Sequence, residues 1–199
     1  MPKIVDHAER RRQIVASVWS LIGRRGLDAV TMRDLAAEAG YANGALAPYF
    51  RNKDEILQAA FQYAFDSTND RAEEAIGDAG GLTALRRLCR EIMPLDENRM
   101  VEARVVVAFW DRALYDEHMA TVFRSAIAQW RERMKVHLLQ ARATGEITTD
   151  ALDDVVIDSL LTTLIGFQTR ALLAPGLPAQ RQEAVLDALL TAFGGPSDK

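Results

Sequence analysis

The sequence predicts an all-helical protein, and three observations support this fold class. Apolar residues recur at spacings of three and four almost everywhere, the period of a helix with one buried face, and the pattern divides into about nine helices. Glycines and prolines interrupt the pattern at clear intervals and mark helix ends. No stretch alternates convincingly between apolar and polar residues, and the β-branched run 105–107 lies inside a longer helical pattern.

The N-terminal part of the chain predicts two helices joined by a short link. The first helix ends at Gly26, and its buried face is expected to contain Ile14, Val18, Leu21 and Ile22. The second helix begins with a capping-box pattern, because Thr31 precedes Asp34 by three residues. It is expected to end at Gly40, where a positive φ carries no Cβ penalty.

A very short third helix is expected over about residues 43–49, with Leu46 and Phe50 facing inward. Asn52 and Glu55 then form a cap signal at the start of a long helix. Two short helices joined by a glycine turn form a helix-turn-helix, which places its second helix in the major groove of DNA. Spacing alone makes this a moderate signal, since many helical proteins contain two short helices around a glycine.

The second half of the chain predicts long apolar helices. Residues 116–143 form a helix of about 40 Å with one apolar stripe: Met119, Phe123, Ile127, Trp130, Met134 and Leu138. Residues 153–174 are apolar around more than half of the helix circumference, which indicates burial on two sides. A two-fold homodimer explains this width, and a helix central to its own bundle is the alternative. The expected dimer interface is Leu160, Thr163, Gly166, Phe167, Arg170, Val185 and Leu189.

The charge of the chain is uneven. Residues 1–60 carry nine Lys and Arg against seven Asp and Glu, whereas the rest carry 15 against 21, and the net charge is −4. A mildly basic head on an acidic body indicates separate roles and excludes a uniformly basic nucleic-acid coat. The one cysteine, Cys89, excludes an intramolecular disulfide and lies in an apolar helical pattern typical of a small buried side chain.

The sequence also predicts a cytoplasmic location. The first ten residues contain no apolar signal region. The longest uncharged apolar candidate, 159–165, is far shorter than the ~18 residues of a membrane span, so no membrane partner is expected.

The order of residues within the helix-turn-helix is more specific than its spacing. It resembles the DNA-binding domain of the TetR family of transcriptional repressors over about residues 8–57. The matching positions are Thr31, Arg33, Leu35, Ala36, Ala39, Gly40, Gly44, Leu46, Tyr49, Phe50, Lys53 and Leu57. The stretches 95–113 and 164–173 resemble the BetI-type C-terminal domain of the same family, which serves regulators of many different ligands.

The resemblance implies two domains and a mechanism. Residues 1–52 form the helix-turn-helix DNA-binding domain, and residues 53–199 form the effector-binding and dimerisation domain. The implied function is a homodimeric repressor that binds double-stranded DNA at a palindromic operator. A small-molecule effector of unknown identity binds the C-terminal bundle and releases the repressor from its operator.

The expected DNA contacts lie at helix starts. Thr31 offers its hydroxyl and the adjacent N–H groups to a phosphate, and Arg33 reaches the backbone or a guanine edge. Asn43 is suited to read adenine, while Gly44 and Ala45 allow close approach. Tyr49 and Lys53 match the family's backbone contacts. The full expected set is Thr31, Arg33, Ala42, Asn43, Gly44, Ala45, Pro48, Tyr49 and Lys53.

Three positions depart from the family pattern. Ala42 stands where a Ser or Thr usually caps the third helix, and Ala47 lacks the usual tyrosine hydroxyl. Pro48 supplies no N–H and disturbs a helix of barely two turns. These changes leave open an alternative function, a dimeric small-molecule-binding protein of the same fold that has weakened or lost specific DNA recognition.

The expected effector site consists of large side chains on the apolar stripes. They are Phe61, Phe65, Leu88, Ile92, Phe109, Trp110, Phe123, Ile127, Trp130 and Met134. Core packing is the alternative for each of them. Trp110 and Trp130 are suited to an aromatic cage for a quaternary ammonium, and a neutral apolar or aromatic effector is an equally open alternative.

No motif indicates an enzyme. The sequence contains no Gly-x-Ser-x-Gly, no P-loop and no zinc-type His-Glu pair. The three histidines, His7, His118 and His137, are scattered. We therefore expect no catalytic residue, metal site or cofactor, while an enzyme with a dispersed active site stays open as a third alternative.

Overall fold

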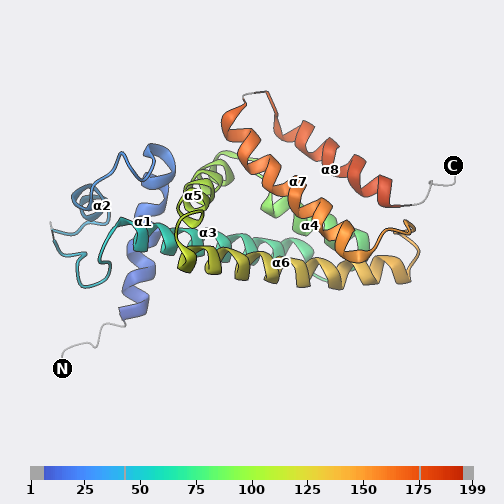
Figure 1. Cartoon of the computed structure of the whole chain (residues 1–199), viewed down its shortest axis with the longest axis horizontal. Coiled ribbons are helices and arrows are strands. Elements are labelled where there is room, and N and C mark those ends of the chain that lie inside the picture. Colours follow the sequence, from blue (N-terminus) through green and yellow to red (C-terminus); the bar gives the residue numbers. More distant parts are fainter. Residues whose placement is uncertain (1–6, 43, 175, 195–199) are drawn as a thin grey trace. The chain divides into compact units, whose positions relative to one another are not determined.

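A computed structural model describes residues 7–42, 44–174 and 176–194 of the chain. Within these ranges the chain forms eight α-helices and no strand (Figure 1), which confirms the all-helical class. The helices are α1 (His7–Arg25), α2 (Met32–Glu38), α3 (Lys53–Ile76), α4 (Gly81–Ile92), α5 (Glu97–Ala113), α6 (Glu117–Ala143), α7 (Asp153–Leu173) and α8 (Ala179–Phe193).

The helices divide into two compact units. The first unit consists of Met1–Asp66 and Val101–Thr121, and the second of Ser67–Met100 and Val122–Lys199. Three helices, α3, α5 and α6, therefore contribute residues to both units.

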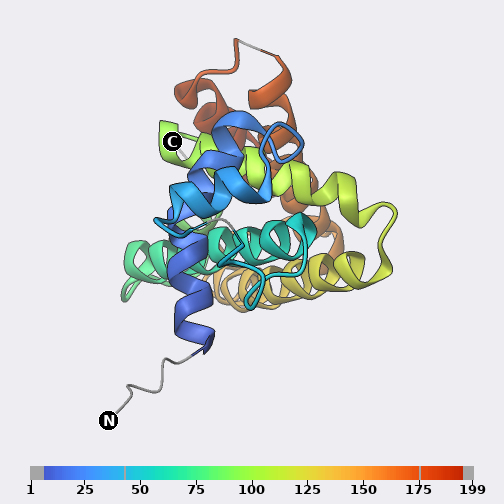
Figure 2. The same cartoon turned by 90° about the vertical axis from the view of Figure 1, so that its left-hand side faces the viewer.

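The first unit contains α1 and α2, and Figure 2 views the molecule from the side of these two helices. The expected face of α1 is buried, with Ile14, Val18, Leu21 and Ile22 at most 7% exposed. Phe61 of α3 stacks on Phe109 of α5 with ring centroids 4.1 Å apart. At the end of α5, the Arg112 guanidinium donates to Asp28 at 2.6 Å, in the link between α1 and α2. Residues 101–121 are thus packed and ion-paired against the N-terminal helices.

The second unit has one continuous apolar core that includes residues of α4, α6, α7 and α8. Cys89 lies fully buried in this core, and burial raises the pKa of its thiol to about 12. At the edge of the core, Arg86 of α4 donates twice to Asp187 of α8, at 2.6 and 2.8 Å. Two buried glutamines bind the end of α4 and the link that follows it, since Gln168 donates to the Ile92 carbonyl and Gln182 to the Pro94 carbonyl.

The packing of α7 in this core largely explains why the helix is apolar around more than half of its circumference. Leu160 is fully buried and Phe167 is 5% exposed within the chain itself. These two residues, which were expected at a dimer interface, thus lie in the chain's own core, and a contact with a partner remains a prediction for them. By length and composition α7 could cross a membrane, the one such helix in the described part of the chain. It begins with Asp153 and Asp154, and its buried residues belong to the core.

In the first unit α1 and α5 approach each other closely at a glycine. A Cβ at position 23 would lie 2.5 Å from Val101 Cγ1 and 2.7 Å from the Val101 carbonyl oxygen. These distances are well below van der Waals contact, so only glycine fits here without displacing α5.

We predict that Gly23→Ala destabilises the protein by about 1–3 kcal/mol, because the helices must separate to admit the methyl group. Ser17→Ala, at an exposed position of the same helix, serves as the control and should change stability by less than about 0.5 kcal/mol. Urea unfolding followed by circular dichroism measures both. Equal stability of Gly23→Ala and the native chain would contradict the close approach.

Candidate nucleic-acid interface

Helix α2 has well-defined caps at both ends. At its start Thr31 and Asp34 form the expected capping box, in which the Asp34 N–H donates to Thr31 Oγ1 at 3.1 Å and the Thr31 N–H donates to Asp34 Oδ2 at 2.8 Å. At its end the Tyr41 N–H donates to the Ala36 carbonyl, and Gly40 has φ +74°. This is a Schellman ending, so both predicted boundaries of the helix are confirmed.

The expected short helix after α2 is not a regular α-helix. Residues 44–49 form consecutive turns, and with Phe50 we call this segment the recognition turn. The Ala47 N–H donates to the Gly44 carbonyl, and the Tyr49 N–H to the Leu46 carbonyl, both over three residues. Gly44 has φ +86°, outside the helical region, and Pro48 has no N–H to donate. Leu46 and Phe50 are buried as expected, at 1% exposed each.

The expected DNA-contact residues occupy two neighbouring parts of the first unit, the start of α2 and the recognition turn with its flanks. Thr31, Arg33, Ala42, Gly44 and Pro48 are exposed, while Ala45, Tyr49 and Lys53 are half-buried. Asn43 lies outside the described residues.

Two of these side chains have partners within the chain. The Thr31 hydroxyl donates to Asp34 at 2.7 Å and accepts from the Asp34 N–H. The N–H groups of Met32 and Arg33 are then the donors of the first turn of α2 for a phosphate. The Lys53 ammonium donates to the carbonyls of Leu27 and Val30, both at 3.1 Å. Lys53 therefore holds the link between α1 and α2, and one of its three N–H groups remains for a phosphate.

Two residues of α1 that are not in the expected DNA-contact set contact the recognition turn. The Arg11 guanidinium donates to the Tyr49 carbonyl and lies 4.3 Å from the centre of the Phe50 ring. The His7 ring lies 4.8 Å from the Tyr49 ring, and its Nε2 is 3.1 Å from the Pro48 carbonyl oxygen. These contacts join residues 38 and 41 positions apart, so no periodic signal in the sequence could have indicated them.

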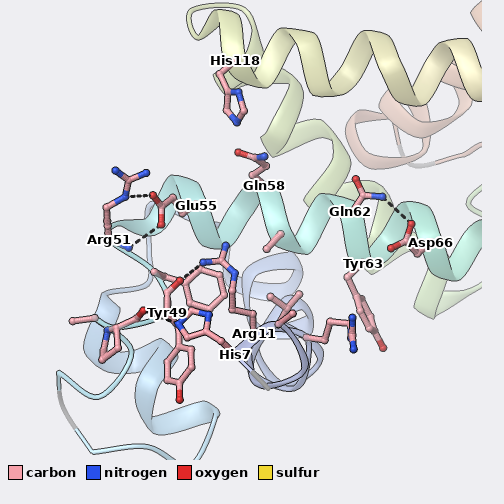
Figure 3. A pocket seen from close by; sticks show the side chains of 17 residues that line it. His7, Arg11, Tyr49, Arg51, Glu55, Gln58, Gln62, Tyr63, Asp66 and His118 are labelled. Carbon is pink, nitrogen blue, oxygen red and sulfur yellow. Dashed lines mark hydrogen bonds and ion pairs between the residues drawn. The ribbon is translucent and has the colours of Figure 1, made fainter. Parts of the chain in front are cut away.

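Behind these contacts lies a cavity of about 780 Å³, shown in Figure 3. Its walls are α1, the recognition turn and the first half of α3, and His118 faces Gln58 across it. Glu55 in its wall accepts from the Arg51 N–H at 2.9 Å, and this bond, as the main cause, lowers the pKa of the Glu55 carboxyl.

The expected effector residues divide between the two units. Phe61, Phe65 and Phe109 are buried in the first unit, where Trp110 is half-buried. Leu88, Ile92 and Met134 are buried in the core of the second unit, as their core alternative implies. Phe123, Ile127 and Trp130 are half-buried on α6, and the Trp130 indole N–H donates to Asn69 at 3.2 Å. An effector role remains a prediction for each.

The remaining expected dimer residues lie at or near the surface of the second unit. Gly166, Arg170 and Val185 are exposed, while Thr163 and Leu189 are half-buried.

Comparison with known proteins identifies the family. Residues 14–60 match the model of bacterial regulatory proteins of the tetR family, and residues 81–195 match that of the BetI-type transcriptional repressor C-terminal domain. The chain belongs to the TetR family. It is a DNA-binding transcriptional regulator, as its resemblance to that family implied.

Relatives match this TetR-family chain over most of its length. The transcriptional repressor Rv1474c of Mycobacterium tuberculosis is 30% identical over 94% of this chain and 95% of its own. The regulator PksA of Bacillus subtilis is 28% identical over 88% and 84%. A solved regulator from Rhodococcus sp. Rha1 has a TM-score of 0.80 at 26% identity, covering 92% of this chain and 95% of its own. A regulator from Saccharomonospora viridis, solved with choline, shares the fold with a TM-score of 0.84 at 22% identity over 92% and 96%.

The capping box predicts a pH dependence for the head of this TetR-family chain. Hydrogen bonds from the Thr31 backbone and side chain lower the pKa of Asp34 from 3.8. The ionised Asp34 carboxylate therefore stabilises the folded chain fully above pH 3.8, the pKa of the unfolded chain. This stabilisation is lost as the pH falls through the lower pKa of Asp34 in the folded chain. We predict that Asp34→Ala lowers the melting temperature at pH 7 and that its difference from the native chain shrinks below pH 3.8.

Glu38→Ala is the matched control, because it removes the same charge from the other end of α2, where no capping bond is lost. Melting curves of the three proteins between pH 2.5 and 7 make the comparison. A difference between Asp34→Ala and the native chain that stayed constant over this range would rule out the ionised cap.

Proposed function

We propose that the chain is a homodimeric repressor that binds a palindromic operator and leaves it when a small molecule binds. Residues 1–52 would contact DNA, and residues 53–199 would bind the effector and a second copy of the chain. The protein would act in the cytoplasm, where its operator lies, and without catalytic chemistry.

The observation that carries the DNA-binding part is the exposure of the start of α2 and of the recognition turn in the same unit. Arg33 is exposed in the first turn of α2, where the backbone N–H groups have no carbonyl partner within the helix. An anion is favoured at such a helix end. Gly44 is exposed in the recognition turn and carries no side chain that would hold DNA at a distance. These features support phosphate contacts at α2 and base contacts at the recognition turn.

The outer surfaces of α7 and α8 support the homodimer. The exposed positions of α8 include Ala184, Val185 and Ala188, which with Arg181 line a shallow hollow of about 530 Å³. On α7 the exposed positions include Thr162 and Gly166. Small, mostly uncharged side chains allow close helix packing, and a copy of the same surface would bury them.

The effector part is supported by the half-buried stripe on α6, Phe123, Ile127 and Trp130. Such side chains can contact a ligand without a change in the core. Two heads bind half-sites one helical turn apart only when their centres are about 34–36 Å apart. An effector that prefers another head spacing therefore shifts the population away from the DNA-bound state. Choline, which the S. viridis protein binds, is the first compound to test.

The test begins with selection of genomic DNA fragments on the purified protein. We expect a palindromic site with nanomolar affinity that weakens steeply with salt. Arg33→Ala should weaken binding to this site about tenfold or more. Arg104→Ala removes an equal charge from an exposed position of α5 and should have a small effect.

Selection of no sequence, or uniform micromolar binding, would favour the alternative protein that binds small molecules without specific DNA recognition. Equal losses for Arg33→Ala and Arg104→Ala would mean that Arg33 acts only through net charge.

The dimer predicts a second result. Val185→Glu should weaken self-association by about a hundredfold or more, because the carboxylate would be buried without a partner. Val136→Glu, on α6 at a position 54% exposed against 42% for Val185, is the control and should leave the dimer intact. Sedimentation velocity over a range of protein concentrations distinguishes monomer from dimer. A dimeric Val185→Glu variant, or a monomeric Val136→Glu variant, would show that the dimer interface does not lie on α8.

A further inference from the structure

The recognition turn cannot hold its own shape by backbone hydrogen bonds. Between Gly44 and Phe50 the bonds from Ala47 and Tyr49 span three residues, and only the Phe50 N–H donates over four, to the Leu46 carbonyl. The N–H that would continue a helix at position 48 is missing, because that residue is proline. A segment this short is also far below the length at which a helix persists alone. Its conformation must therefore come from neighbouring residues.

Two residues of α1 contact the C-terminal end of the turn, at residues 48–50. Arg11 donates to the Tyr49 carbonyl, which follows Pro48 directly, and its guanidinium covers the Phe50 ring at 4.3 Å. His7 lies one turn earlier on α1. Because a carbonyl oxygen only accepts, the His7 Nε2–H donates to the Pro48 carbonyl at 3.1 Å. The same imidazole packs on the Tyr49 ring.

These contacts engage both backbone carbonyls, of Pro48 and Tyr49, and both aromatic rings, of Tyr49 and Phe50. Phe50 is anchored in the core at 1% exposed, while Pro48 is exposed. The contacts therefore fix the C-terminal end of the turn, from the exposed Pro48 to the buried Phe50. In Figure 3, Arg11, His7 and Tyr49 lie together on one side of α3.

We propose that Arg11 and His7 are positioning residues that hold the recognition turn in its DNA-reading conformation. By binding the carbonyls of Pro48 and Tyr49 they compensate for the one helical bond that the missing Pro48 N–H cannot make. This inference rests on the proposed contact of the turn with base edges. Base recognition depends on exact placement of short side chains and backbone, whereas a phosphate contact tolerates displacement. Loss of the clamp formed by Arg11 and His7 should therefore reduce specific binding more than non-specific binding.

The first experiment compares Arg11→Met with Arg12→Met. Methionine keeps an apolar stem over Phe50 but cannot donate to the Tyr49 carbonyl. Arg12 is the next residue on α1, pairs with Glu9 at 2.6 Å and is 68% exposed, so Arg12→Met removes the same charge and leaves the clamp intact.

We expect Arg11→Met to lower the ratio of operator affinity to non-specific affinity about tenfold. Arg12→Met should weaken both affinities together and leave the ratio within about twofold. Equal ratios for the two variants would overturn the proposal, because the effect of Arg11 would then be one of charge alone.

A second experiment uses Pro48→Ala, which restores an N–H at position 48. If the clamp compensates for the missing helical bond, Arg11→Met should lower the specificity ratio less in the Pro48→Ala background, by about threefold instead of tenfold. A role of Arg11 in general stability would reduce binding equally in both backgrounds, and that result would overturn the proposal. His7→Phe, which keeps ring packing on Tyr49 and loses the bond to Pro48, should give a smaller loss of the same kind.

A third measurement needs no DNA. Hydrogen exchange of the Tyr49 and Phe50 amides in the full chain should be faster by about tenfold in Arg11→Met and unchanged in Arg12→Met. Unchanged exchange in Arg11→Met would refute the clamp. If the native chain selects no operator but the amides respond as expected, the clamp stands as a structural device and only the DNA-binding function fails.

Discussion

The segments proposed to contact DNA, α2 and the recognition turn, are too short to fold alone, and they depend on burial of their apolar side chains. Helix α2 has seven residues, and isolated helices shorter than about 12–15 residues are marginal in water. Leu35 and Ala36 of α2, and Leu46 and Phe50 of the recognition turn, are all at most 1% exposed. Each large apolar side chain buried in this way contributes roughly 1.5–3 kcal/mol. Burial of these side chains therefore supplies the stability that α2 and the recognition turn lack by themselves.

The cations of the head illustrate the same dependence. Lys53 and Arg11 both lie near the expected DNA surface, yet both donate to backbone carbonyls of the head itself. Arg112 pairs with Asp28 at 2.6 Å and with Asp54 at 3.5 Å, which ties the end of α5 to the head. Arg33 differs from these residues, since it is exposed at a helix start. A basic residue near the expected DNA surface can therefore stabilise the fold, bind DNA or do both. The hydrogen bonds that its side chain makes within the chain show whether it stabilises the fold.

Local features of the fold were predictable, because short-range chemistry determines them. The capping box of Thr31 and Asp34, the end of α2 at Gly40 and the bond from the Glu55 N–H to Asn52 all follow from residues a few positions apart. The buried face of α1 follows from helical periodicity in the same way.

Features that depend on contacts between distant residues could not be predicted from helical periodicity. The apolar spacing of α7 is correct, but the sequence does not say whether Leu160 meets its own core or a partner, and it meets the core. The helix expected over residues 43–49 was inferred from apolar spacing, and the structure has local turns over residues 44–49, where Gly44 has a positive φ and Pro48 lacks an N–H. The clamp of His7 and Arg11 was missed because its partners lie about forty residues along the chain. Candidate site residues could therefore be named from the motif, while their individual roles could not.

The buried thiol of Cys89 has a practical consequence. A thiol reacts as its thiolate, and a pKa of about 12 in a fully buried site leaves almost none at neutral pH. Since the chain contains one cysteine, its native surface offers no competing thiol to a maleimide or spin label. A cysteine introduced at an exposed position of the head can be labelled selectively without removing Cys89 from the core. Distances between paired labels would then report the separation of the two heads in a dimer directly, with and without a bound effector.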